Sequence, residues 1–73
     1  MGIRAVFAEN LRRERLGRGF SQEDLAHRAD LDRTYISSLE RQKYGVSIDV
    51  LARLAKVLEV APSQLLEQTK RRR

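Results

Sequence analysis

A chain of 73 residues has room for one small domain, and a domain of this size buries only about 60% of the surface that its unfolded chain exposes. The 15 lysine and arginine residues outnumber the 10 acidic residues, and the net charge of +5 favours a polyanionic partner, nucleic acid before anionic membrane. The lack of cysteine and the single histidine exclude a disulfide framework and a thiolate zinc site.

The first predicted helix runs from about residue 3 to residue 16. Along the chain, apolar residues recur at spacings of three and four, which is the helical period. In the first helix this spacing stacks Phe7, Leu11 and Arg15 on one face, and Gly17 and Gly19 then end the helix. The whole pattern predicts an all-α domain, a compact five-helix bundle without strands.

The second and third predicted helices are short and close together. Ser21 caps the second helix, Asp24 completes a capping-box pattern, and the helix ends near Ala29. Asp32 is a suitable cap for the third helix, which reaches residue 40 or 41. The two-residue link leaves room only for a tight turn between two packed helices.

The fourth predicted helix begins after the cap Ser47 and carries an apolar stripe that matches one buried face: Ile48, Leu51, Leu54, Ala55 and Leu58. Pro62 suits the first turn of a fifth helix, although Ala61 is a poor cap for it. We expect one domain over residues 1–69, followed by a basic, disordered tail over residues 70–73.

Two short helices joined by a tight turn can insert the second helix into the major groove of DNA, but small helical bundles share the same periodicity. Further segments occur in order: Leu11 with Arg15, then residues 19–26, 31–41 and 47–51, then Leu54 with Ala55. Over residues 11–66 the sequence therefore resembles the phage-repressor or Cro-like (xenobiotic-response-element type) helix-turn-helix family. It is most similar there to the small controller proteins of restriction-modification systems.

The resemblance implies that residues 32–41 form the recognition helix. The residues expected to face the DNA bases are Arg33, Thr34, Ser37 and Ser38. Arginine can donate two hydrogen bonds to guanine, while threonine and serine can donate or accept. The alternative is an ordinary solvated helix face.

The resemblance also implies contacts to the DNA backbone and one structural ion pair. The backbone candidates are Gln22, Tyr35, Arg41, Gln42, Lys43 and Tyr44. Tyr35 could instead pack half-buried against the first helix. The ion pair joins Arg15 to Glu40 between the first and third helices. Asp30 and Gln42 stand where the family usually has glycine; aspartate tolerates the left-handed turn, whereas Gln42 suggests a locally different loop.

A homodimer surface is expected in the carboxyl-terminal half. Its candidates fall off the main buried stripe or follow it: Val50, Val57, Val60, Leu65 and Leu66. Some of them could instead close the core, Leu65 first. A twofold dimer would place two recognition helices about 34 Å apart, matching half-sites about ten base pairs apart in a pseudo-palindromic operator.

The sequence thus predicts a cytoplasmic, sequence-specific double-stranded DNA-binding transcription regulator, of the restriction-modification controller type. No secretory signal and no apolar run near the roughly 20 residues of a bilayer span is present. We expect a dimer over a promoter to block RNA polymerase and one just upstream to recruit it. We expect no cofactor, no metal and no enzyme activity, since His27 lies among charged neighbours and paired catalytic carboxylates are lacking. The alternatives are a protein-interaction module such as an antitoxin and, less favoured, a double-stranded RNA binder.

Overall fold

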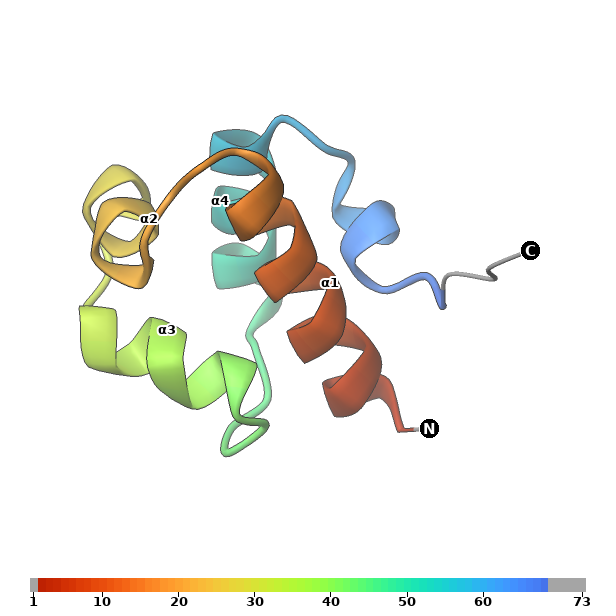
Figure 1. The fold of residues 1–73 in the computed structure, drawn as a ribbon. Helices are drawn as coiled ribbons and strands as arrows, with labels where there is room; N and C mark the ends of the chain where they lie inside the picture. Colours follow the sequence, from red (N-terminus) through yellow and green to blue (C-terminus); the bar gives the residue numbers. More distant parts are fainter. Residues whose placement is uncertain (1, 69–73) are drawn as a thin grey trace.

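The computed structural model describes residues 2–68, and the basic tail over residues 70–73 lies outside them. In the described part, four α-helices precede one 3-10 helix (Figure 1): α1 Ile3–Gly17, α2 Gln22–Ala29, α3 Arg33–Glu40, α4 Ile48–Leu58 and η1 Pro62–Leu65. The predicted all-α class is confirmed. None of these helices is both long enough and apolar enough to cross a membrane.

The prediction of a fifth α-helix is wrong, because the segment forms only the four-residue turn η1. Ala61 has no side-chain oxygen to cap it; instead, the Gln64 side chain supports the start of the turn, since its Oε1 accepts from the Ala61 amide at 2.7 Å. The carbonyls at the end of the turn are taken by a side chain instead of by further helical amides. Asn10 Nδ2 donates to the carbonyl oxygens of Leu65 and Glu67 at 2.9 and 2.8 Å.

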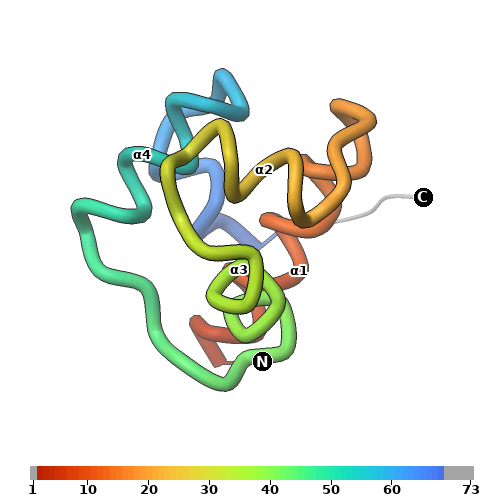
Figure 2. Tube along the Cα trace, turned by 90° about the vertical axis from the view of Figure 1, so that its left-hand side faces the viewer, coloured from red at the N-terminus to blue at the C-terminus, as the bar shows by residue number. Residues whose placement is uncertain are grey.

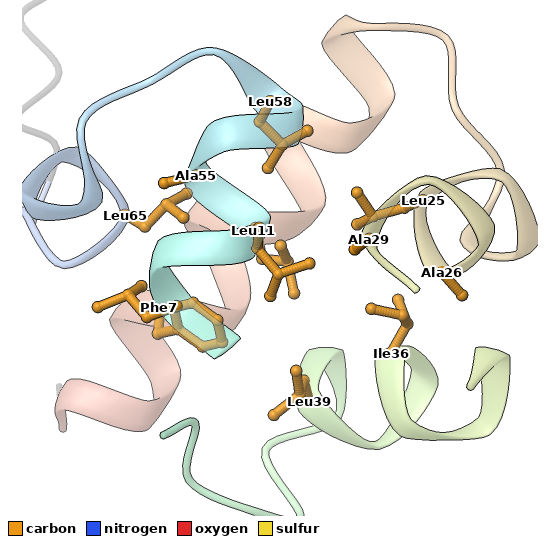
Figure 3. Close-up of a cluster of buried hydrophobic side chains, with 12 residues drawn as sticks. Phe7, Leu11, Leu25, Ala26, Ala29, Ile36, Leu39, Ala55, Leu58 and Leu65 are labelled. Carbon is orange, nitrogen blue, oxygen red and sulfur yellow. The ribbon is translucent and has the colours of Figure 1, made fainter. Parts of the chain in front are cut away.

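The hydrophobic core lies where all five elements converge (Figure 3). It is built from residues of every helix, the largest of them fully buried: Leu11, Leu25, Ile36, Leu39, Leu54, Leu58 and Leu65. The predicted stripes of α1 and α4 face this core, with one exception. Ile48, the first residue of α4, is 82% exposed, whereas Leu51, one turn later, is buried.

Two serines cap their helices as predicted. The Ser21 hydroxyl accepts from the Asp24 amide at 2.9 Å while the Asp24 carboxylate accepts from the Ser21 amide at 3.0 Å, a complete capping box. The Ser47 hydroxyl accepts from the Val50 amide at 3.1 Å. Asp32 occupies the N-cap position of α3, but its side chain makes no capping hydrogen bond.

All four α-helices end in the same left-handed turn. After each helix one residue has a positive φ, and the next amide donates to the carbonyl five residues earlier at 2.8 to 3.1 Å, a Schellman motif. The left-handed residues, with φ of 74°, 58°, 64° and 60°, are Gly19, Asp30, Gln42 and Glu59. Asp30 therefore tolerates the turn as expected, and Gln42 takes up the glycine-like conformation itself.

Candidate nucleic-acid interface

Helix α3 lies at the edge of the molecule, packed against α2 and α1 (Figure 2). Its inner side contributes Ile36 and Leu39 to the core. On its outer side Arg33 and Thr34 are exposed and Ser37 is half-buried. Polar side chains thus cover the face that the rest of the domain leaves free.

Ser38 corrects the predicted base-contacting set, because it is only 6% exposed. The left-handed turn at Gln42 folds the chain back over the end of α3, and the Lys43 amide donates to the Ser38 carbonyl at 2.9 Å. Three of the four base-contact candidates remain available to a ligand: Arg33, Thr34 and Ser37.

A hydrogen-bonded cluster fixes α3 against α1 and α2. Arg15 Nε donates to Glu40 Oε2 at 2.6 Å and Nη2 donates to Oε1 at 3.0 Å. Arg15 Nη1 also donates to the Phe20 carbonyl at 2.9 Å, and Gln22 Nε2 donates to Glu40 Oε1 at 3.1 Å. The ion pair expected from the resemblance is thus present. Gln22, a backbone-contact candidate at the first position of α2, additionally buttresses α3.

The other backbone-contact candidates lie mostly in the connection from α3 to α4. Tyr35 is half-buried and packs against the core, while the rest are exposed and consecutive in sequence: Arg41, Gln42, Lys43 and Tyr44. Within residues 2–68, no ion pair or hydrogen bond engages the side chains of Arg33, Arg41 or Lys43. Their charges are therefore available to a partner.

The predicted dimer surface is corrected at Leu65, which is fully buried in the core. Three of the other candidates are half-buried against the core: Val50, Val57 and Val60. Leu66 is exposed, and so are Ile3 and Ile48, which sequence reasoning did not place on this surface. Ile48 was instead predicted to be buried, because its spacing matches the apolar stripe of α4.

Other charged groups have local structural roles. The amide and hydroxyl of Ser21 hold the pKa of the Asp24 carboxyl below its ordinary value. Arg28 lies over the Phe20 ring, 4.5 Å from its centroid, and Arg53 Nη1 donates to the Ala29 carbonyl at 3.3 Å. Within the described residues, no group of three His, Cys, Asp or Glu side chains could hold a metal ion.

Comparison with known proteins agrees with this geometry. The sequence model of the helix-turn-helix family matches residues 11–65. A hypothetical transcription factor of Neisseria meningitidis is 44% identical over 64 residues, which are 88% of this chain and 60% of that protein. Control protein C.BamHI of Bacillus amyloliquefaciens is 44% identical over 68 residues, 92% of this chain and 84% of that protein.

A solved structure has the same fold. The restriction-modification controller protein C.AhdI from Aeromonas hydrophila superposes with a TM-score of 0.82 at 37% identity, covering 85% of this chain and 94% of that chain.

Proposed function

The chain belongs to the Cro/C1-type helix-turn-helix family of DNA-binding transcription regulators, and we propose that it binds a pseudo-palindromic operator as a homodimer. The observation that carries the proposal is the outer face of α3, where the exposed Arg33 and Thr34 flank the half-buried Ser37. An α-helix fits the major groove of B-form DNA, and the wrong base opposite a well-paired arginine is disfavoured by about 1–3 kcal/mol. Arg33 therefore reads a guanine.

Contacts to the DNA backbone set the register of that helix. Gln22 lies at the start of α2, where the helix dipole favours a phosphate, and Arg41 and Lys43 carry unengaged charges just beyond α3. These groups do not distinguish one base from another. They bring the protein to DNA, so the affinity falls steeply as salt concentration rises.

The similarity to control proteins supports a narrower role as a restriction-modification controller. A homodimer presents two copies of α3 about 34 Å apart, which matches two half-sites about one helical turn apart. Occupancy of such an operator regulates transcription: a dimer over a promoter blocks RNA polymerase, and one just upstream recruits it.

The test is selection of binding sites from a random duplex library at near-physiological salt. The wild-type protein is expected to select two symmetric half-sites. Arg33→Ala is expected to lose about tenfold or more of its preference at one symmetric position, because a bidentate contact to guanine is removed. Lys56→Ala removes an equal charge from the exposed carboxyl-terminal end of α4, far from α3 (Figure 1), and should leave the selected site unchanged.

Binding that depends on salt but shows no sequence preference would contradict the proposal. An acidic protein partner, as for an antitoxin that keeps this fold, would then account better for the basic surface.

A further inference from the structure

The turn between α2 and α3 leaves two carbonyl groups without a backbone donor. Asp30 ends α2 in the left-handed conformation, and the capping amides donate to carbonyls further back in the helix. Within residues 2–68, no backbone amide donates to the carbonyl of Ala29 or of Asp30. Carbonyls at this end of a helix carry partial negative charge, so they require donors from outside the helix.

A side chain of α4, which packs against α2, supplies this donor (Figure 2). Arg53 Nη1 donates to the Ala29 carbonyl at 3.3 Å and to the Asp30 carbonyl at 3.4 Å. One guanidinium thus bridges the last residue of α2 and the residue that caps it, at the end where the helix dipole favours a cation. Among the described residues Arg53 forms no ion pair, so the turn is what its side chain engages.

We propose that Arg53 is a positioning residue for base recognition: through the backbone of the turn it sets the start of α3, and with it the Arg33 side chain. This inference rests on the proposed function, in which Arg33 reads a guanine, and it adds a residue of α4 that itself touches no base. Only Leu31 and Asp32 separate Asp30 from Arg33, the first residue of α3. A displacement of the turn is therefore passed to the side chain whose two hydrogen bonds to guanine depend on its placement.

The start of α3 has less polar support than its end. Glu40, the last residue of α3, accepts hydrogen bonds from α1 and α2, whereas Asp32 at the N-cap makes no capping hydrogen bond. Leu31 and Ile36 pack against the core, but apolar contacts are not directional. Over the eight residues of α3, about 12 Å, a small rotation about the fixed end displaces the other. The hydrogen bonds of Arg53 oppose this rotation.

The residue at the turn makes such support necessary. Asp30 has a φ of 58°, a conformation that a residue with a Cβ adopts at a cost and that glycine adopts freely. The hydrogen bond from Arg53 to the Asp30 carbonyl is available in this conformation and so stabilises it. Asp30 and Arg53, 23 residues apart in sequence, therefore form one structural unit at the joint of the helix-turn-helix.

A double-mutant cycle on the selected operator tests the inference. Arg53→Met keeps a long side chain without donors and is expected to lower the affinity for the operator by about fivefold or more. In the Arg33→Ala background the same change should alter the affinity by about twofold at most, because the contact that Arg53 positions is already absent. Arg53→Lys should lose less than Arg53→Met, since an ammonium can still donate at the end of α2. Lys56→Met is the matched control, because it removes an equal charge from the exposed side of the same helix.

Hydrogen exchange of the free protein measures the same positioning without DNA. The amides of Tyr35 and Ile36 donate to the Asp32 carbonyl in the first turn of α3. Arg53→Met should accelerate their exchange by about fivefold relative to the amides of α1, and Lys56→Met should not.

Three results would overturn the inference. Equal losses of affinity with and without Arg33, together with a weaker dependence on salt, would mean that Arg53 contacts a phosphate itself. Wild-type affinity in Arg53→Met, or unchanged exchange at the start of α3, would mean that the turn does not need it. A wild-type protein without sequence preference would instead contradict the proposed function, and the exchange measurement, made without DNA, separates that failure from a failure of Arg53 to hold the turn.

Discussion

Arg15 and Glu40, 25 residues apart in sequence, are joined by two hydrogen bonds of 2.6 and 3.0 Å between side chains that are only 9% and 5% exposed. Such a pair adds little net stability, because both charges lose their water. The remaining polar atoms are satisfied by the Phe20 carbonyl and the Gln22 amide. The pair therefore fixes where α3 sits on α1, and neither member can be removed alone without consequence.

Glu40→Ala is expected to lower the free energy of unfolding by about 3 kcal/mol, because it leaves the Arg15 guanidinium buried without its counter-charge. The double variant Arg15→Met with Glu40→Leu should be closer to wild type in stability, since no charge remains buried. Urea unfolding at neutral pH measures both. Equal losses in the single and double variants would refute this account.

Two neighbouring glycines should respond oppositely to alanine. Gly19 has a φ of 74°, so Gly19→Ala is expected to lower the free energy of unfolding by about 1 kcal/mol. Gly17 is helical and an added Cβ meets nothing within 4 Å, so Gly17→Ala should raise it by about 0.5–1 kcal/mol. Thermal and urea unfolding of the two variants give the comparison, and shifts of the same sign would contradict it.

Asn10→Ala should loosen the carboxyl-terminal segment selectively. It leaves buried backbone carbonyls without a donor, at an expected loss of about 2 kcal/mol. Hydrogen exchange should accelerate around residues 64–67 more than in α2 and α3. Gln64→Ala is the control, because it removes only the exposed hydrogen bond to the Ala61 amide. Hydrogen exchange that accelerates equally across the domain would show that Asn10 does not stabilise the carboxyl-terminal segment selectively.

The Asp24 capping box predicts a defined acid dependence. The pKa of this carboxyl is below its ordinary value of 3.8 in the folded protein, so its contribution to stability is present above the unfolded pKa. That contribution is lost as the pH falls through the folded pKa. The difference in unfolding free energy between wild type and Asp24→Ala should therefore shrink as the pH falls from neutral through the ordinary value of 3.8 and then through the lower folded pKa. A difference independent of pH would exclude an ionised cap.

Local signals in the sequence predicted much of this fold. The apolar period placed α1 to α4, and Ser21 and Ser47 marked the starts of α2 and α4 through hydrogen bonds to residues three positions away. The features that the sequence did not predict depend on contacts between residues distant in sequence. Nothing in the local sequence marks Asn10 as structural, because its role is to donate a hydrogen bond to the carbonyl of Leu65, 55 residues later.

The errors at the candidate site have the same origin. Ser38 does not lie on the core side of α3, which Ile36 and Leu39 define, so the helical pattern placed it outward. It is nevertheless buried, and the chain after Gln42 folds back to its backbone, where the Lys43 amide donates to the Ser38 carbonyl. Ile48 shares the apolar side of α4, yet lies beyond the elements that cover that side. Helical periodicity fixes the direction of a side chain but not what, if anything, covers it.

The two aromatic phenols of the chain lie in separate environments. Tyr35 is half-buried in α3, and Tyr44 is 58% exposed in the connection from α3 to α4. Since the sequence contains no tryptophan and phenylalanine does not absorb at about 280 nm, the emission excited at that wavelength comes from these two rings. With tyrosine excited selectively, a Tyr44→Phe variant would emit only from α3, and a Tyr35→Phe variant only from the connection between α3 and α4, so the chain carries separate optical reporters for the proposed recognition helix and for the segment that follows it.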